Sequence, residues 1–187
     1  MAVRDILAPD LAVVFCGINP GATAAAAGHN FSSHSNRFWR AIHLAGFTPE
    51  LLPAQEEERL LDYGCGLTAV VARPTRGAAD LSRAELIAAA DPFRARMERC
   101  APRAIAFLGK PAYAAIVARR ELPWGRQAET FAGAAVWLLP NPSGLNRAFS
   151  LAQLVEAYGA LRLAIADDLA RFSGRAEPAV PGAPTRT

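Results

Sequence analysis

The chain has 187 residues, of which 52% are hydrophobic, 20% are charged and 8% are aromatic, and its formal net charge is +3. This composition supports a folded domain with a buried core and excludes a disordered chain. No apolar run approaches the roughly 20 residues that a membrane-spanning helix needs, and no secretory signal is visible, so we expect a soluble, cytoplasmic protein.

The first half of the chain alternates apolar runs with turn residues. Residues 11–18 form a continuous apolar run, typical of a strand buried on both faces, and Asn-Pro-Gly ends it. The further elements expected here are a polar loop over residues 22–35, a helix over 36–46 capped by Asn36, a helix over 54–63 and a strand over 67–71.

The second half repeats this alternation. Ser82 and Glu85 form a capping-box pattern that predicts a helix over residues 83–100, which Pro92 can interrupt. The remaining elements expected are a strand over residues 104–108, a helix over 111–118, an irregular segment over 122–127, an edge strand near 129–131, a strand over 134–139 and a helix over 150–172. We assign residues 1–172 to a single domain and residues 173–187, rich in Pro, Gly and Ala, to a disordered tail.

Strands that alternate with helices predict a mostly parallel α/β sheet with helices on both faces. In such sheets, ligands bind beyond the carboxyl ends of the strands. Residues 19–21 and 141–143 each follow an expected strand, and each reads Asn-Pro and then a small residue. If both strands are parallel, these two loops lie at the same edge and can form one site.

The first loop places the side-chain amide of Asn19 directly after a buried strand. Gly21 and Gly28 allow backbone N–H groups to approach a ligand closely. The loop lacks the closing Gly-Lys-Ser/Thr of a phosphate-binding loop and the spacing of a dinucleotide site. The residues alone leave two interpretations open: a ligand site, and a structural turn in which Asn19 tolerates an unusual backbone conformation.

The second loop, residues 141–147, presents an apolar Leu145 among Gly, Asn and Arg residues. An exposed apolar side chain beside an arginine on a short loop suits a wedge that enters between DNA bases. The alternative is a surface leucine that packs under the last helix.

Charge and cysteine usage add two constraints. No Asp or Glu occurs in residues 11–49 or 130–155, so both loops suit a polyanionic partner, although the arginine-rich composition also fits genomic base composition.

Cys16, Cys65 and Cys100 form no C-x-x-C pair, and the histidines lack helical pairing with carboxylates, so neither disulfides nor a metal site is predicted. We expect Cys16 to be a small buried side chain.

Several motifs together resemble the mismatch-specific uracil/thymine DNA glycosylases, the second family of the uracil-DNA glycosylase superfamily. The resemblance extends over about residues 15–165, and the two Asn-Pro motifs match the family in order and spacing. The motifs that carry it are GINPG (17–21), GHNF (28–31), NRFW (36–39), LLDYGCGLT (60–68), RP (73–74), LGK (108–110), NPSGLNR (141–147) and VEAY (155–158).

The resemblance implies a three-layer α/β/α sandwich with a four-stranded, mostly parallel sheet. It also implies a monofunctional glycosylase of base-excision repair, without metal or organic cofactor, that hydrolyses the N-glycosidic bond of a pyrimidine flipped out of DNA. We expect a monomer whose partner is double-stranded DNA with a mismatched or damaged pyrimidine, and no membrane partner.

Roles for individual residues follow from the resemblance. It assigns Asn19 to positioning the attacking water and Asn141 to holding the leaving base. Phe31 would stack on the flipped base, and backbone groups from Ile18 to Gly21 would read its edge.

The NPSGLNR motif supplies the DNA contacts that the resemblance implies. Leu145 would fill the gap left by the flipped nucleotide, with Arg147 beside it. Backbone groups of Gly144 and Asn146 would face the orphaned guanine, which fits a preference for mispairs with guanine.

Ala24, Ala69 and Asn146 depart from residues common in the family, and these departures concern the substrate range more than the reaction. We expect uracil opposite guanine first, then ethenocytosine, with thymine depending on room near Ala24. Two alternative functions are a mismatch-binding protein with little catalysis and a broader uracil glycosylase, and a more distant alternative is a nucleotide-binding enzyme.

For Lys110 we expect a phosphate contact or a solvated helix end, and for Ser143 a loop-capping hydroxyl.

Overall fold

The strands predicted from the sequence assemble into one sheet. The computed structural model describes residues 3–173, and at its centre is a five-stranded sheet in the order β2-β1-β3-β5-β4. The strands are β1 (Val13–Gly17), β2 (Cys65–Ala69), β3 (Ala104–Leu108), β4 (Gly125–Phe131) and β5 (Ala134–Leu139). β1, β2, β3 and β5 are parallel, whereas β4 pairs antiparallel with β5, so the predicted mostly parallel sheet is confirmed.

The edge strand β4 is a fifth strand, where the resemblance implied four and the sequence pattern predicted a short edge strand near residues 129–131. It begins at Gly125, within the segment predicted as irregular, and a turn at Ala132 and Gly133, both with positive φ, leads into β5. Only Gln127 and Phe131 of this strand are buried. An edge strand with so few buried residues carries a weak hydrophobic pattern, which is why the sequence underestimated it.

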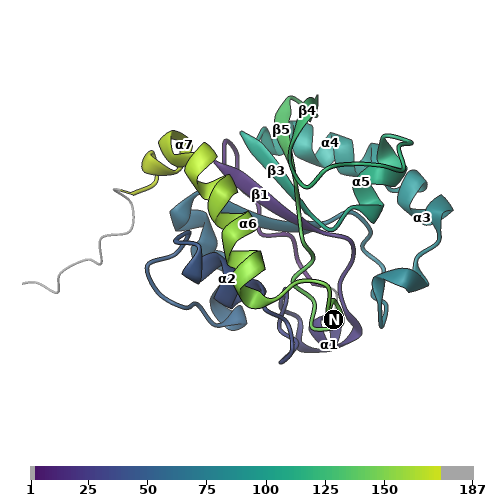
Figure 1. Ribbon diagram of the computed structural model, residues 1–187, viewed down its shortest axis with the longest axis horizontal. Helices are drawn as coiled ribbons and strands as arrows, with labels where there is room; N and C mark the ends of the chain where they lie inside the picture. Colours follow the sequence, from purple (N-terminus) through teal and green to yellow (C-terminus); the bar gives the residue numbers. More distant parts are fainter. Residues whose placement is uncertain (1–2, 174–187) are drawn as a thin grey trace, which may run out of the picture.

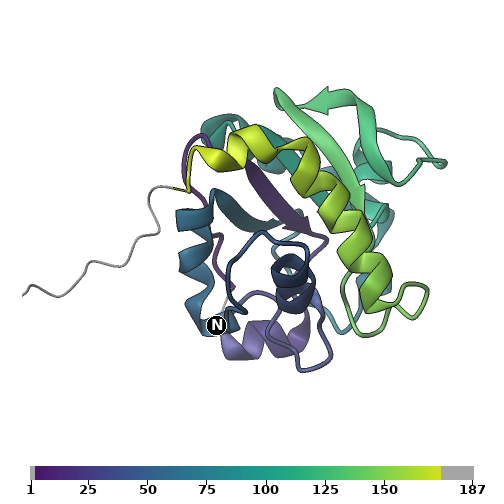
Figure 2. The same cartoon turned by 60° about the vertical axis from the view of Figure 1, so that its left-hand side comes forward.

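Helices cover both faces of the sheet, as predicted (Figure 1). The layer on one face contains α2 (Phe38–Leu44), the 3-10 helix η1 (Ala54–Tyr63) and α6 (Leu151–Ala164). The layer on the other face contains α3 (Arg83–Ala88), α4 (Ala90–Cys100) and α5 (Pro111–Ile116). Figure 2 shows α6 lying across the sheet, and α7 (Ala166–Ala170) follows it.

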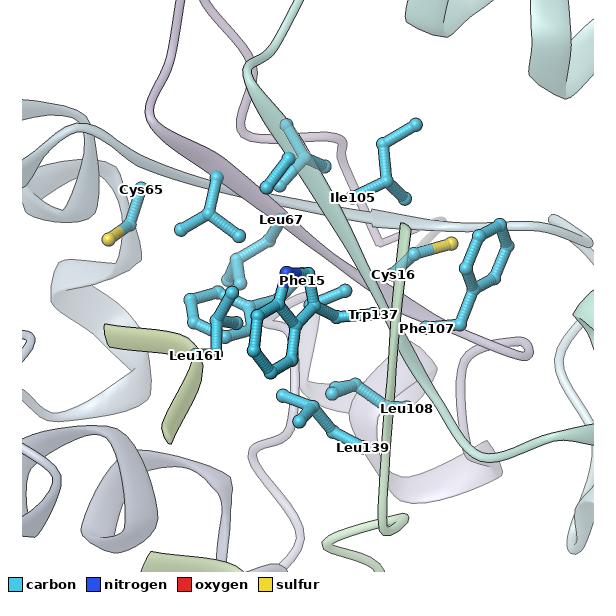
Figure 3. Close-up of a cluster of buried hydrophobic side chains, with 14 of the residues drawn as sticks. Phe15, Cys16, Cys65, Leu67, Ile105, Phe107, Leu108, Trp137, Leu139 and Leu161 are labelled. Carbon is cyan, nitrogen blue, oxygen red and sulfur yellow. The ribbon is translucent and has the colours of Figure 1, made fainter. Parts of the chain in front are cut away.

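Alternate residues of β1 build the two cores. Phe15 points toward the layer of α2, where its ring centroid lies 5.4 Å from that of Phe38. Its neighbour Cys16 is paired in register with Phe107 of β3, which packs against α4 on the other face. Figure 3 shows Cys16 beside Phe107, its partner in register. The expectation that Cys16 is a small buried side chain is confirmed, because it is 1% exposed.

A short helix, α1 (Ala22–Ala27), occupies part of the segment predicted as a polar loop over residues 22–35. This segment is mostly alanine, the strongest helix former, and Gly28 ends the helix in the left-handed conformation at φ 77°. The remainder of the predicted loop, up to Arg37 at the beginning of α2, contains no helix or strand.

Two long predicted helices are each divided in two. The helix predicted over residues 83–100 forms α3 and α4, which meet at Ala89, and Pro92 lies in the first turn of α4, where proline is tolerated. The helix predicted over residues 150–172 is interrupted at Ile165, where φ is −113°. The helix over residues 54–63 has the predicted bounds but is a 3-10 helix with a kink at Glu56.

The carboxyl ends of the four parallel strands lie at one edge of the sheet. Because β4 is antiparallel, Gly125 at its beginning is paired with Leu138 near the end of β5, which brings Trp124 to the same edge. Both Asn-Pro loops therefore lie at this edge, as predicted, together with Trp124.

Between residues 3 and 173, no helix has the length and apolar character needed to cross a membrane. The tail predicted over residues 173–187 lies outside the described residues, except for Ser173.

Candidate active site

A cavity of about 940 Å³ lies at the edge where the parallel strands end. The loops that follow the four parallel strands line it, together with Trp124 and the segment between α1 and α2. The described residues that line it include no Asp, Glu, His or Cys, and its charged members are Arg76 and Lys110. Such a cavity offers neither a carboxylate for general acid–base chemistry nor a set of metal ligands, and its positive charge suits a phosphate backbone.

The side chain of Asn19 lines the cavity and is fixed by the segment after β2. Its amide nitrogen Nδ2 donates hydrogen bonds to the backbone oxygen of Arg73 (2.8 Å) and to Oγ1 of Thr75 (2.7 Å). Because a backbone oxygen can only accept, Nδ2 rather than Oδ1 must face Arg73. Both amide hydrogens are then used, and no described residue donates to Oδ1. This oxygen is therefore available to accept a hydrogen bond from a molecule in the cavity.

The partners of Asn19 are themselves held in place. The backbone N–H of Thr75 donates to the backbone oxygen of Pro20 (3.1 Å), which joins the segments after β1 and β2. Arg73 forms an ion pair with Glu85 (2.7 Å). Hydrogen bonds from the backbone N–H of Ser82 and from Arg73 lower the pKa of Glu85, so the carboxylate stays charged.

Asn141, in the loop after β5, has the opposite orientation. Its Oδ1 accepts a hydrogen bond from the backbone N–H of Ser143 (2.9 Å), and its backbone oxygen accepts one from Nδ2 of Asn146 (2.9 Å). The Nδ2 of Asn141 has no partner among residues 3–173 and can donate to an acceptor in the cavity. The two asparagines thus offer an acceptor and a donor to the same space, as the carbonyl and imide groups of a pyrimidine would require.

Phe31 lines the cavity, and Phe38 supports its ring from behind. The two rings are stacked with centroids 4.2 Å apart and planes at 28°. A Cβ at Gly17 would lie 3.6 Å from Cζ of Phe31, so the ring also rests against the end of β1. Since Phe38 does not line the cavity, the second face of Phe31 remains for a planar ligand.

The backbone of Phe31 is strained, with φ 53°, and a buried carboxylate restrains the residue before it. Glu57, which is 3% exposed, accepts hydrogen bonds from the backbone N–H (2.8 Å) and Nδ2 (3.0 Å) of Asn30. The ring nitrogen Nδ1 of His29 lies 3.3 Å from the same carboxylate, and Nε1 of Trp39 donates to the backbone oxygen of Asn30 (3.2 Å). The contact to Glu57 gives His29 a partner within the protein.

Among residues 3–173, Leu145 is the most exposed of the large apolar side chains, at 74%. The alternative that it packs under the last helix is therefore wrong. A Cβ at Gly77, which also lines the cavity, would lie 3.9 Å from Cδ1 of Leu145. The hydroxyl of Ser143 accepts from the backbone N–H of Leu145 (3.3 Å), which confirms its expected loop-capping role. Arg147 is exposed and forms no ion pair with any described residue.

Gly144 lies where the second loop meets the segment before α2. A Cβ at this position would lie 2.4 Å from Cβ of Ser35 and 2.7 Å from its backbone oxygen, so no other residue fits without a shift of the backbone. The backbone of the second loop thus packs directly against Ser35, beside Leu145.

Two further residues at this edge were not singled out from the sequence. Thr75 orients Asn19, and Arg37 donates hydrogen bonds to several backbone oxygens of the second loop. Both lie in or next to motifs of the resemblance, RP (73–74) and NRFW (36–39), which was the available signal.

Lys110 caps α5, and its Nζ lies 4.3 Å from the ring centroid of Trp124. Trp124 is 41% exposed and meets Phe149 edge to face, with centroids 5.4 Å apart. These three side chains line the end of the cavity nearest β4. Ile18, Gly21, Ala24 and Ala69 also line the cavity.

The cysteines offer no nucleophile to this cavity. Burial raises the pKa of the Cys65 thiol to about 12, and burial also raises the pKa of Cys16. Over the described part of the chain, no group of three or more His, Cys, Asp or Glu side chains could hold a metal ion. The chemistry available at the site is therefore that of amides, an aromatic ring, backbone groups and fixed positive charge.

A family model described as the uracil DNA glycosylase superfamily matches residues 5–162. The match covers all five strands, both Asn-Pro loops and the residues that line the cavity, apart from Val3. Members of this superfamily are DNA glycosylases of base-excision repair, which hydrolyse bonds between base and sugar. The fold, the cavity and this match together place the chain in the uracil DNA glycosylase superfamily.

Proposed function

We propose that this protein is a monofunctional DNA glycosylase that excises uracil, and related pyrimidine lesions such as ethenocytosine, from mispairs with guanine. The observation that carries the proposal is the pairing in one cavity of Asn19, with a free side-chain oxygen, and Phe31, with a free ring face. A base inside a duplex cannot reach such a cavity, so the nucleotide must rotate out of the helix.

The proposed chemistry follows from what Asn19 can and cannot do. Its Oδ1 accepts a hydrogen bond from a water molecule and orients it toward C1′ of the deoxyribose, but an amide is a very poor base. The glycosidic bond must therefore break largely before water attacks, through an oxocarbenium-like transition state. Asn141 donates to the departing base and stabilises the charge that develops on it.

The lining supports pyrimidines as substrates and leaves room for thymine. Ala24 and Ala69 are small, and nothing lies within 4 Å of a Cβ placed at Gly21, which also lines the cavity. A methyl group at C5 of the base therefore does not by itself exclude thymine opposite guanine.

Preference for guanine as the opposite base rests on the second loop. Leu145 enters the stack where the flipped nucleotide was, and backbone groups of Gly144 and Asn146 face the orphaned base. We propose that the protein acts on double-stranded DNA as a cytoplasmic monomer.

A strand-cleavage assay after alkali tests the proposal. One labelled duplex carries G·U, G·T, A·U, G·ethenocytosine or hypoxanthine at a single site, beside single-stranded DNA with uracil. We expect cleavage confined largely to lesions opposite guanine, abolished by Asn19→Ala while mismatch binding persists. Equal loss of binding and cleavage would contradict the role of Asn19.

Two other outcomes would replace the proposal. Cleavage of A·U and of single strands at similar rates would identify a broader uracil glycosylase whose second loop does not read guanine. Tight mismatch binding without cleavage would identify a protein that shields mismatched bases.

A further inference from the structure

Within residues 3–173, the side chain of Arg37, at the beginning of α2, donates all its hydrogen bonds to the loop that carries Leu145. Nε donates to the backbone oxygen of Pro142 (3.3 Å), Nη1 to that of Phe149 (2.5 Å), and Nη2 to those of Ser143 (3.0 Å) and Asn146 (2.8 Å). The backbone N–H of Arg37 also donates to Pro142 (3.0 Å). Arg37 thus donates hydrogen bonds to backbone oxygens at both ends of the loop that contains Leu145.

Only a guanidinium can make this set of contacts. Arginine presents five N–H groups in a rigid plane, whereas the ammonium of lysine presents three around a single atom. Arg37 is half-buried and forms no ion pair with any described residue, so its charge is directed at carbonyl dipoles inside the protein. By contrast, Arg40, one turn further along α2, is exposed and makes no such contacts.

The segment that contains Arg37 also supports the base-stacking ring. Phe38, the next residue, stacks beneath Phe31 at 4.2 Å, and Ser35, two residues earlier, packs against Gly144. Residues 35–38 therefore contact the loop of Leu145 on one side and the proposed base-binding ring on the other.

We propose that Arg37 is a positioning residue that holds residues 142–149 in the conformation in which Leu145 enters DNA. This inference rests on the proposed function, because it assigns a task to a residue of that same site. Arg37 does not touch the substrate. It acts through Leu145, and its loss lowers base flipping and excision together.

The experiment uses the full chain and a duplex in which a 2′-fluoro-deoxyuridine, which resists hydrolysis, lies opposite guanine and next to 2-aminopurine. Fluorescence of 2-aminopurine rises when its neighbour leaves the stack, so it reports flipping without chemistry. The variants are Arg37→Gln, Arg37→Lys, Leu145→Ala and the double variant Arg37→Gln/Leu145→Ala. Arg40→Gln is the matched control, since it removes the same charge from the same helix. Excision of ordinary G·U is measured in parallel, below the melting temperature of every variant.

We expect Arg37→Gln to reduce the flipping equilibrium and the excision rate by at least about tenfold, because several backbone oxygens lose their donor. Arg37→Lys is expected to restore part of both, and Arg40→Gln to match the wild type. The double variant is expected to flip and excise the base as well as Leu145→Ala alone, because both changes remove the same contribution, the insertion of Leu145 into DNA.

Two results would overturn the inference. One is a wild type that flips and excises while Arg37→Gln and Arg37→Lys behave as wild type. The other is a double variant whose losses multiply, which would show that Arg37 acts independently of Leu145. A wild type that neither flips nor excises would instead refute the proposed function, so the two failures are distinguishable. If Arg37→Gln does not fold, the comparison of Arg37→Lys with Arg37→Lys/Leu145→Ala decides the question in the same way.

Discussion

The orientation of one amide decides what Asn19 can do, and Thr75 sets that orientation. A side-chain amide that rotated by half a turn would present N–H groups to the cavity, and these cannot accept a hydrogen bond from water. The hydroxyl of Thr75 accepts from Nδ2 of Asn19 and donates to the backbone oxygen of Gly77 (2.7 Å), so its own direction is fixed as well.

We therefore predict that Thr75→Val lowers kcat for excision of uracil about tenfold or more, with little change in KM, because one of the two bonds that orient Asn19 is lost. Valine has nearly the shape of threonine, so the packing of this buried position is kept. Thr75→Ser, which retains the hydroxyl, serves as the control and is expected to remain close to wild type. Single-turnover kinetics on a G·U duplex measure both constants, and a Thr75→Val enzyme with wild-type kcat would contradict the assignment.

Residues with a proposed direct chemical role were the easiest to find from the sequence, and residues that would act through them were not. Asn19, Phe31 and Asn141 lie in motifs whose order carries a family resemblance, and the structure brings all three to one cavity. The partners that orient them are distant in sequence, such as Thr75 for Asn19 and Arg37 for the second loop. A single sequence contains no signal for such a pairing, because the pairing exists only once the strands are assembled.

At the scale of elements, the site depends on the close contact between the second loop and the segment before α2, where Gly144 meets Ser35. Gly144 lies so close to Ser35 that a methyl group would overlap both the side chain and the backbone of Ser35. The two closest atoms belong to the side chain of Ser35, Cβ at 2.4 Å and Oγ at 2.5 Å, whereas the backbone oxygen at 2.7 Å would remain after a change at Ser35.

Gly144→Ala is accordingly predicted to displace the second loop and to lower excision of G·U about tenfold or more while the melting temperature falls by only a few degrees. The double variant Gly144→Ala/Ser35→Gly is expected to recover only part of the activity, since the backbone contact persists. Full recovery would mean that the side chain of Ser35 is the whole obstacle. Melting curves and excision rates of the three proteins provide the test.

Helix α6, which covers the sheet and leads directly out of the second loop, begins with a capping box. Oγ of Ser150 accepts from the backbone N–H of Gln153 (3.2 Å), and Oε1 of Gln153 accepts from the backbone N–H of Ser150 (2.8 Å). Further along, the hydroxyl of Tyr158 donates to the backbone oxygen of Pro140 (3.0 Å) and ties the helix to the start of the loop.

Ser150→Ala should lower the free energy of unfolding by about 1 kcal/mol, which is typical for the loss of an N-terminal cap. Tyr158→Phe should cost a similar amount, roughly 1–3 kcal/mol, because it leaves the buried oxygen of Pro140 without a donor. Urea denaturation measures the free energy of unfolding of both variants, provided that their m-values equal that of the wild type. Ser82→Ala, which removes the equivalent cap of α3 on the far face, is the comparison for Ser150→Ala.

The sequence predicted buried elements more accurately than exposed ones. β3 and β5 have the predicted bounds, because each is an uninterrupted apolar run between turn residues. β4 was underestimated and the last helix was not divided at Ile165, because an exposed edge and a helix break leave little trace in hydrophobic periodicity. The position of Trp124 at the site depends on β4 being antiparallel, so it could not be predicted before the sheet was known.

Across the whole molecule, charge is distributed so that the cavity edge carries positive charge without nearby carboxylates in its lining. The two acid-free segments noted in the sequence, residues 11–49 and 130–155, contain both Asn-Pro loops and meet at this edge. Arg76 and Arg147 are exposed there, and neither forms an ion pair within the described part of the chain. At the opposite edge, Arg103 precedes β3, and its Nε lies 4.0 Å from Oδ1 of Asp168.

This asymmetry predicts how DNA binding depends on salt. Each phosphate contact contributes about 0.9 to the slope of log K against log salt concentration, because binding releases condensed counterions. Arg147→Gln should therefore weaken binding to matched and mismatched duplexes alike and reduce the slope by about 1. Arg103→Gln removes the same charge from the far edge and should leave the slope unchanged, although the net charge of the two variants is identical. Fluorescence anisotropy with a labelled duplex over a series of salt concentrations gives both slopes. Equal slopes for the two variants would show that total charge, rather than its placement around the cavity, governs the approach to DNA.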